Sequence, residues 1–306
     1  EARKKLKQEG CKSAPSPEIL ELIQDKGLQK QFYQDNEIPT SSFELYESKS
    51  AVLIAVESGA IQFPFVQKLR KGGYDGRGVA VISDVNDLGK LLDGACVIEA
   101  KVAIEKELSV VVARNQNGEV KCYPVVEMLF DPKANLVDKL ICPSVISEEK
   151  SEKALNYASK IIETLDMEGL LAVEFFLDTK GDIVVNEMAP RPHNSGHHTF
   201  ESVVTSQFEQ HLRAVLNLPL GSTEIKMPSV MINILGAEGH EGPVHYEGLV
   251  ESMAIEGVKI HIYGKKITKP YRKMGHVTIM SASIEEAQEK ADRVKQLIKV
   301  KSCKRN

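Results

Sequence analysis

The sequence predicts an α+β fold, with a small α/β unit followed by a larger, strand-rich part. From about residue 40 to 100, short helix and strand patterns alternate. From about 101 onward, the alternating run IEKELSVVVAR, the turn NQNG and the return run EVKCYPVVE are typical of an antiparallel hairpin. A chain of 306 residues with 42% hydrophobic content is also large enough for two or more packed units.

The first segment is expected to be helical. Ser16 supplies a capping hydroxyl and Pro17 the first helical position, and apolar residues then continue on one face to about Asn36. NEIPTSSF marks a boundary, because the residue before Pro39 is disfavoured in the helical region. EARKKLKQEG has no initiator Met and resembles the tail of a helix, so we expect an upstream segment to be absent.

The remaining elements follow from hydrophobic periodicity and turn residues. In the small unit we expect a helix near 48–58, strands at 63–69, 79–82 and 95–100, and a helix opened by Asp84. In the larger part we expect strands at 104–114, 119–127, 170–178, 183–189, 228–235, 258–263 and 276–281, and helices at 147–167, 205–216 and 284–300.

Composition excludes several classes of protein. A net charge of −4 does not indicate a nucleic-acid surface, and no apolar run approaches the roughly 20 residues that span a bilayer. We therefore expect neither a nucleic-acid nor a membrane partner. Five cysteines without a CxxC pair suit reduced thiols in a cytoplasm, with neither a disulfide framework nor a zinc site.

Two carboxylates are expected to face each other across a hairpin. If the turn TKGD closes an even loop, Asp178 pairs with Ile183, and counting back pairs Glu174 with Glu187. Like charges placed opposite each other among apolar runs are destabilising, and a cation would relieve them. Magnesium binds one or two carboxylates with substrate phosphates, so the pair predicts the metal end of a nucleotide site. The alternatives are an exposed pair neutralised by a lysine, or an odd turn that places the glutamates on opposite faces.

KGGYDGRG predicts a glycine-rich loop whose backbone amides can approach phosphate oxygens, although such a loop alone is more often a plain hairpin. Lys68 strengthens the phosphate interpretation, because in the alternating strand FPFVQKL it can project toward the same face as the loop. Glu99 and Glu107 offer acceptors for adenine or ribose, but a single glutamate in a strand usually faces solvent.

Two further segments carry polar candidates. NEMAPRPHNSGHHT follows the apolar run IVV, and its prolines exclude a central strand or a helix interior, so it predicts a rigid loop leaving a strand end. YGKKITKPYRKMGH gathers basic side chains between strands, which suits a phosphate or another anion. A solvated loop is the ordinary alternative for both.

Together these motifs resemble one enzyme family. QDK at 24–26, FPFVQK before GGYDGRG, EKELSVVVAR, AVEFFLD before NEMAPRPHNSGHHT, and YGK before RKMGH are similar to the N-carboxyaminoimidazole ribonucleotide synthetases of purine biosynthesis. That family belongs to the ATP-grasp superfamily, and the similarity spans nearly the whole chain in order. It implies an ATP-grasp fold, in which a small α/β lid closes over ATP on a larger antiparallel-sheet domain.

The resemblance implies an ATP-dependent carbon–nitrogen ligase that uses Mg²⁺ and bicarbonate. ATP would phosphorylate bicarbonate to carboxyphosphate, and the amine of 5-aminoimidazole ribonucleotide (AIR) would then be carboxylated, through carbon dioxide released in the closed site. ADP and phosphate would leave. A homodimer and hand-off of the product to a mutase are also implied by relatives.

The family's residues map onto this sequence position by position. Its magnesium ligands match Glu174 and Glu187. Its nucleotide contacts match Lys26 and Lys68 for phosphate, and Glu99 and Glu107 for adenine and ribose. Its substrate and catalytic residues match Tyr74, Asp75 and Arg77 over the imidazole nucleotide, Lys265 and Arg272 on its 5'-phosphate, and Arg191, His193 and Lys273 around bicarbonate or carboxyphosphate. His197 and His198 match no family role, and we expect them to be structural.

On the family pattern, residues 1–39 would be the remnant of an N-terminal Rossmann-like domain, 40–100 the lid, and 101–306 the core with the C-terminal substrate-binding region. Most of the Rossmann-like domain is expected to be absent. That domain forms one wall of the imidazole nucleotide site in the family, so the sequence does not predict that this chain alone is active.

Two alternatives remain at this point. Another ATP-grasp ligase, such as the formate-dependent glycinamide ribonucleotide transformylase, would keep the ATP residues but should lack YDGRG and RKMGH, and both are present. A non-catalytic nucleotide-binding protein is a different class. The intact charges of Glu174, Glu187, Lys68, Arg191 and Lys273 argue against it, because such groups are costly to retain without a use.

Overall fold

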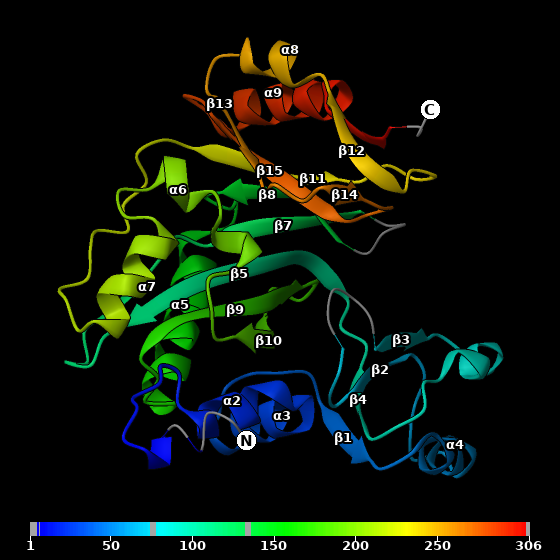
Figure 1. Ribbon diagram of the computed structural model, residues 1–306. Coiled ribbons are helices and arrows are strands. Elements are labelled where there is room, and N and C mark those ends of the chain that lie inside the picture. The colour runs from blue at the N-terminus through cyan, green and yellow to red at the C-terminus, as the bar shows by residue number, and fades with distance from the viewer. Residues whose placement is uncertain (1–4, 6, 74–77, 132–135, 304–306) are drawn as a thin grey trace.

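The computed structural model describes residues 5, 7–73, 78–131 and 136–303. Three antiparallel sheets organise them (Figure 1). A four-stranded sheet has the order β1-β4-β2-β3, and a three-stranded sheet has the order β14-β12-β16. The main path of the nine-stranded sheet is β10-β9-β5-β7-β8-β11-β15-β13, with β6 paired to β5. The expected α+β fold, with a small unit and a larger antiparallel sheet, is confirmed.

The small sheet contains β1 (Phe43–Tyr46), β2 (Phe65–Leu69), β3 (Val79–Ile82) and β4 (Cys96–Ala100). The large sheet contains β5 (Ile104–Arg114), β6 (Val120–Cys122), β7 (Val126–Asp131), β8 (Leu136–Cys142), β9 (Gly169–Asp178), β10 (Ile183–Ala189), β11 (Ser229–Leu235), β13 (Val258–Ile262) and β15 (Lys273–Met280). The third sheet contains β12 (Gly242–Glu247), β14 (Ile267–Thr268) and β16 (Lys299–Ser302). The α-helices are α2 (Pro17–Gln24), α3 (Lys26–Asp35), α4 (Lys49–Glu57), α5 (Glu148–Thr164), α6 (Thr199–Ser202), α7 (Gln207–Val215), α8 (Leu249–Met253) and α9 (Ile284–Leu297).

Strand alternation gives the large sheet two different faces. On β9, Val173 and Phe175 point to the face covered by α5, where they pack with Ala158 and Ile161 in the main core. Residues of the other parity, including Ala172, pack with Ala214 of α7 and with Val203 at one end of the strand. Toward the other end of β9 this second face carries polar side chains. The sheet therefore buries one face and leaves part of the other for the site.

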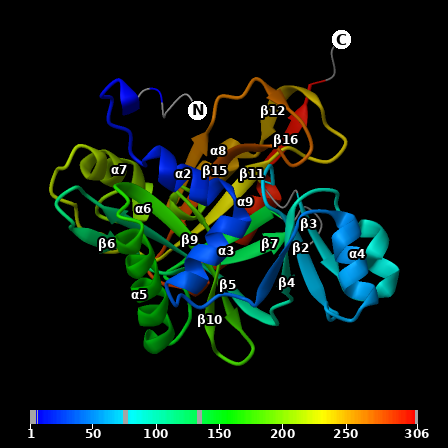
Figure 2. The same ribbon diagram turned by 90° about the horizontal axis from the view of Figure 1, so that it is seen from below.

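The predicted single helix from Pro17 to Asn36 is wrong, because α2 and α3 are separate helices that meet at Asp25. The backbone of Asp25 is extended, and its carboxylate accepts hydrogen bonds from the backbone N–H groups of Gly27 (2.9 Å) and Leu28 (3.3 Å). The same carboxylate binds the Arg70 guanidinium at 2.8 and 2.9 Å. Figures 1 and 2 show both helices between β10 and the small sheet.

Other boundaries differ in ways that burial explains. The helix expected after Asp84 is the 3₁₀ helix η1 (Val85–Lys90), which has no buried residue to anchor a longer amphipathic helix. The last helix ends at Leu297 rather than near 300, and the chain continues into β16, where Val300 is buried. The short strands β1, β8, β12, β14 and β16 and the helices α6 and α8 were not predicted. In the described part of the chain, no helix is long and apolar enough to cross a membrane.

The packing of α5 on the sheet yields a stability prediction. Ile161 is fully buried in the core between α5 and β9, so Ile161→Ala should lower the free energy of unfolding by about 2–5 kcal/mol. Ile54 on α4 is 66% exposed, and Ile54→Ala should change it by less than about 0.5 kcal/mol. Urea unfolding followed by circular dichroism measures both. Equal losses in the two variants would contradict this packing.

Candidate active site

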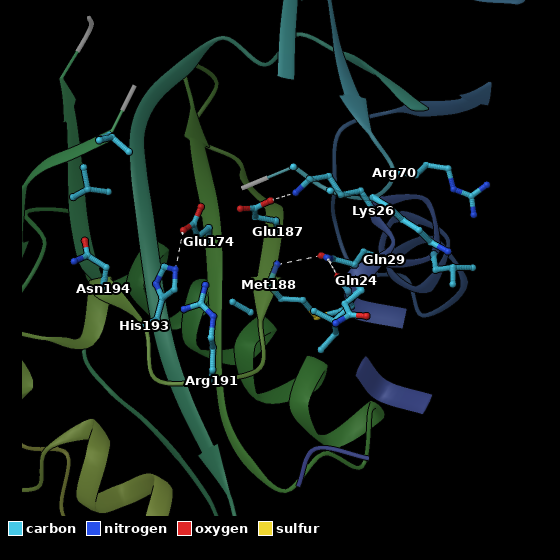
Figure 3. A pocket seen from close by; sticks show the side chains of 18 of the residues that line it. Gln24, Lys26, Gln29, Arg70, Glu174, Glu187, Met188, Arg191, His193 and Asn194 are labelled. Carbon is cyan, nitrogen blue, oxygen red and sulfur yellow. Dashed lines mark hydrogen bonds and ion pairs between the residues drawn. The ribbon is translucent and has the colours of Figure 1, made fainter. Parts of the chain in front are cut away.

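Two cavities adjoin on the open face of the large sheet. The larger, about 930 Å³, lies between the sheet, α2–α3 and the loop after β10. The smaller, about 300 Å³, lies between the small sheet and the large one. Five residues line both: Lys26, Gly73, Phe130, Glu174 and Glu187. The two glutamates thus lie where the cavities adjoin, and Figure 3 shows them side by side among residues that line the larger one.

The hairpin β9–β10 brings the two glutamates together by a different route from the predicted one. Asp178 pairs with Asp182 rather than Ile183, which leaves an odd loop of three residues. Gly181 has φ 90°, as the last residue of such a loop requires. With this turn alone, Glu187 would lie opposite Val173, on the buried face that α5 covers.

A β-bulge at Asn186 reverses that outcome. Val185 still pairs with Phe175, but the next pair is Glu187 with Glu174. Strand β10 therefore holds one extra residue, Asn186, between these two pairs. The predicted pairing of Glu174 with Glu187 is confirmed, although the predicted pairing of Asp178 with Ile183 is wrong. The odd turn and the bulge cancel, so both carboxylates point to the open face.

The two carboxylates carry different charge states. Burial and the neighbouring Glu187 raise the pKa of Glu174 to about 8. Burial acts to raise the pKa of Glu187 as well. The ammonium of Lys26 has the opposite and larger effect, so the pKa of that carboxyl lies below its usual value. His193 Nε2 lies 3.7 Å from Glu174 Oε1. An additional cation between the strands would let both carboxylates ionise.

The donor set fits one hard cation. Among the described residues, no group of three or more His, Cys, Asp and Glu side chains gathers to hold a metal. Magnesium does not require such a cage, since it commonly binds one or two carboxylates together with phosphates and water. Glu174 and Glu187 match that pattern.

Buried charges link the small sheet to the hairpin. Lys68 on β2 donates to Glu99 on β4 (3.1 Å) and to Asn186 Oδ1 in the bulge (2.7 Å). Lys30 on α3 lies 3.2 Å from Glu99 and donates to the Ser41 hydroxyl, 3.0 Å away. Burial acts to raise the pKa of Glu99, but the two lysines hold it below its usual range. Glu99 is 3% exposed, so its predicted alternative as a solvent-facing strand residue is wrong.

Glu107 lines the smaller cavity together with apolar groups such as Val66, Val81 and Phe176. Burial raises the pKa of Glu107 to about 7. The cavity therefore combines an apolar wall with a carboxyl group that can accept or donate a hydrogen bond near neutral pH. Such a wall suits a flat heterocycle.

The loop that follows β10 contributes to the larger cavity. Arg191, His193 and Asn194 line it (Figure 3). Lys273, at the start of β15, lines it as well. Burial, with Arg191 nearby, lowers the pKa of His193 to about 4, so its imidazole is neutral at pH 7. Burial likewise lowers the pKa of His197 to about 4, and that of His198 to about 3.

The remaining basic candidates lie beside this cavity. Lys265 Nζ donates to the Lys273 carbonyl at 2.6 Å, and Arg272 donates to the Ile267 carbonyl at 2.7 Å. Within the described residues, Lys273 lines the larger cavity but Lys265 and Arg272 line neither cavity. Tyr74, Asp75 and Arg77 lie outside the described residues, while Gly72 and Gly73 before them reach the larger cavity.

Comparison with known proteins places this geometry in a family. An ATP-grasp domain model matches residues 31–208, and a model of the phosphoribosylaminoimidazole carboxylase C-terminal domain matches 229–290. The N5-carboxyaminoimidazole ribonucleotide synthase of Bacillus subtilis (strain 168) is 38% identical over 273 residues, covering 88% of this chain and 69% of that protein. The chain belongs to the ATP-grasp N5-carboxyaminoimidazole ribonucleotide synthase family.

Solved structures of this family have the same fold. The N5-carboxyaminoimidazole ribonucleotide synthetase from Thermotoga maritima is 48% identical with a TM-score of 0.90, covering 98% of this chain and 79% of that one. The Aspergillus clavatus enzyme in complex with ADP and 5-aminoimidazole ribonucleotide is 28% identical with a TM-score of 0.85, covering 96% and 78%. The chain spans about half the length of several other curated relatives.

Sequence reasoning missed several residues of this family member's site. The sequence does not single out Asn186 within its polar segment, because the bulge that turns it toward Lys68 leaves no local signal. Gln29 on α3 accepts from the backbone N–H of Met188 at 3.2 Å and so fixes the end of β10. Lys30 is one of many polar residues in its helix. It lies three residues before Tyr33 on α3 and so on the same, buried face, which is the signal that could have found it.

The buried Lys30 predicts a pH dependence of stability. Burial lowers its pKa from 10.5 to about 8, so between these values the unfolded chain binds more protons, and this group makes stability rise with pH. Lys30→Met should remove that contribution. The difference in unfolding free energy, wild type minus variant, should then increase by up to about 3 kcal/mol across this window.

Denaturant titrations at pH 8, 9 and 10 measure the difference. The exposed Lys160 provides the control, and Lys160→Met should give a difference that does not change with pH. If the difference in unfolding free energy for Lys30→Met is also independent of pH, the folded state does not lower the pKa of Lys30.

Proposed function

We propose that this protein catalyses the ATP- and bicarbonate-dependent carboxylation of 5-aminoimidazole ribonucleotide to N5-carboxyaminoimidazole ribonucleotide, in de novo purine biosynthesis. One observation carries the proposal: two adjoining cavities of different chemistry share a pair of facing carboxylates. A nucleotide site and an acceptor site that meet at a metal-binding pair are what phosphoryl transfer from ATP to a second substrate requires.

The smaller cavity is the proposed ATP site. Its apolar wall accommodates adenine, and Glu99 and Glu107 provide acceptors for the base and the ribose. Lys68 and Lys26 also line this cavity, with Lys26 paired to Glu187 and Lys68 bonded to Asn186, and there they would meet the phosphates. Lysine suits that role as a mobile point charge.

The larger cavity is the proposed site of bicarbonate and AIR. Arg191 and Lys273 supply positive charge for bicarbonate and carboxyphosphate, and the neutral His193 supplies a hydrogen-bonding group beside them. For AIR we retain the family roles of Lys265 and Arg272 at the 5'-phosphate and of Tyr74, Asp75 and Arg77 over the imidazole. The full-length protein is the form to which this proposal applies.

The chemistry follows from this placement. A bicarbonate oxygen attacks the γ-phosphorus of ATP, ADP leaves, and carboxyphosphate forms. Carboxyphosphate then breaks the bond between its carbon and the bridging oxygen, which releases phosphate and carbon dioxide. The amine nitrogen of AIR attacks that carbon, and its N–H proton passes to the departing phosphate. Magnesium, held by Glu174 and Glu187, would offset negative charge on the transferred phosphoryl group. Arg191 and Lys273 bind and orient the acceptor so that it faces the nucleotide across the carboxylate pair.

We further propose that the three segments 1–39, 40–100 and 101–306 act as a remnant of an N-terminal domain, a lid, and a core with the C-terminal substrate region. A homodimer is supported by an apolar strip on α7 and the residue that follows it, where Phe208, Leu212 and Leu216 are 41%, 58% and 64% exposed. All five cysteines are free, which supports the expected cytoplasmic location. Hand-off of the labile product to a mutase is consistent with this chemistry.

The function is tested by ADP release from the full-length protein with ATP, magnesium and bicarbonate, with and without AIR. We expect strong stimulation by AIR, because AIR consumes the carboxyphosphate that ATP cleavage generates. If the protein binds nucleotide but AIR does not stimulate ADP release, the assignment of the ATP site stands and AIR is rejected as the substrate.

Glu187→Gln tests the magnesium assignment. The change removes one ligand charge at nearly constant size, so magnesium-dependent turnover should fall by about 100-fold or more while the fold, measured by circular dichroism, is kept. Glu127 provides a matched control, because it is a buried strand glutamate paired with Lys106 at 2.7 Å and it lines neither cavity. Glu127→Gln should leave turnover within about twofold. Near-normal turnover in Glu187→Gln would remove this residue from the metal site.

A further inference from the structure

A buried amide outside every recognised motif holds the backbone of His193. Gln207 begins α7 and is fully buried. Its Oε1 accepts from the His193 N–H at 2.8 Å, and its Nε2 donates to the His193 carbonyl at 2.8 Å and to His197 Nδ1 at 3.0 Å. Both N–H groups and the carbonyl of the amide are therefore committed to the loop that carries the histidine.

The surrounding chain is built around this amide. A Cβ on Gly196 would lie 2.5 Å from Gln207 Oε1, so only glycine allows the approach. Thr199 Oγ1 accepts from the Gln207 backbone N–H at 2.9 Å and donates to the Gly196 carbonyl at 2.5 Å. The glycine and threonine of the run HNSGHHT thus fix the position of Gln207 relative to the loop.

The imidazole ring of His193 is fixed from its other side. The Ser195 backbone N–H points at His193 Nδ1 (3.4 Å), and the Ser195 hydroxyl lies 2.9 Å from the same nitrogen. The hydroxyl of Ser109 on β5 lies 2.9 Å from that of Ser195, and both serines are buried. A backbone N–H can only donate, so Nδ1 is an acceptor and the neutral ring carries its proton on Nε2.

We propose that Gln207 is a positioning residue that, together with Ser195, fixes His193 with its Nε2–H directed at the Glu174 end of the larger cavity. Gln207 holds the backbone, and Ser195 selects the tautomer. The ring then presents a hydrogen-bond donor to an anion in the cavity, beside Arg191 and Lys273. The role of His193 in binding bicarbonate rests on the proposed function. The positioning of His193 by Gln207 and Ser195 does not.

The helix contains a matched control. Gln210, one turn further along α7, is also fully buried and makes the same pair of bonds, accepting from the Gly221 N–H at 2.8 Å and donating to the Gly221 carbonyl at 3.0 Å. Gly221 lines neither cavity among the described residues. Gln207→Met and Gln210→Met each remove one such clamp while keeping side-chain length, so they should destabilise the fold to similar extents.

The two variants are compared by kinetics in the full-length protein. Gln207→Met should lower kcat/KM for bicarbonate by roughly tenfold to a hundredfold, with KM for ATP within about twofold of wild type. Gln210→Met should leave both constants within about twofold. Two results would show that Gln207 is only a structural residue and overturn the proposal. One is an equal loss of kcat/KM for bicarbonate in the two variants. The other is a rise in KM for ATP in Gln207→Met as large as its loss of kcat/KM for bicarbonate.

Two measurements do not depend on activity. Hydrogen exchange of the segment 190–198 should quicken in Gln207→Met and not in Gln210→Met, and unchanged exchange would overturn the clamp. Nitrogen-15 spectra of the wild-type protein should show His193 as the Nε2–H tautomer, and the Nδ1–H tautomer would overturn the proposal even if neither variant folds. If wild type shows no release of ADP stimulated by AIR, the proposed function fails while these two measurements still decide the clamp.

Discussion

The meeting of two carboxylates across β9 and β10 is the constraint around which the rest of the site is arranged. The bulge at Asn186 turns Glu187 from the buried face to the open face, opposite Glu174. Two carboxylates in a partly buried setting cannot both keep their charge without compensation. Lys26 on α3 and Lys68 of the small sheet lower the pKa of Glu187, whereas burial and Glu187 raise the pKa of Glu174 to about 8, with the neutral His193 ring 3.7 Å away.

The break between α2 and α3 is part of the same arrangement. Asp25 ends one helix, caps the next and binds Arg70 at the end of β2, while the Lys26 backbone N–H donates to the Arg70 carbonyl at 2.9 Å. Lys26 therefore leaves the helix start in a fixed direction, toward Glu187. One carboxylate thus couples the helical segment to the small sheet and aims the lysine.

The sequence sufficed where local pattern decides structure, and failed where distant partners do. Hydrophobic periodicity predicted the strands at 170–178 and 183–189, and glycine and proline located the loops. The bulge at Asn186 could not be predicted. An odd turn with a bulge pairs Glu174 with Glu187 just as an even turn without a bulge would, so the sequence does not distinguish the two. The helix break at Asp25 depends on an arginine 45 residues away, and Gln207 looks like any polar residue on an exposed helix until the loop is packed against it.

The charges of the site also indicate how a nucleotide would be accommodated. Lys26 is paired with Glu187, and Lys68 with Glu99 and Asn186, so both lysines serve as internal counterions. If the smaller cavity receives a magnesium nucleotide as proposed, the cation can replace Lys26 at Glu187 while the lysines turn to the phosphates. Glu187 would then exchange Lys26 for the cation, and Glu99 would keep Lys30, 3.2 Å away, so neither carboxylate is left buried alone. On that proposal, Lys26 offsets the charge of Glu187 in the free protein, and the metal would offset the charge of both carboxylates in the complex.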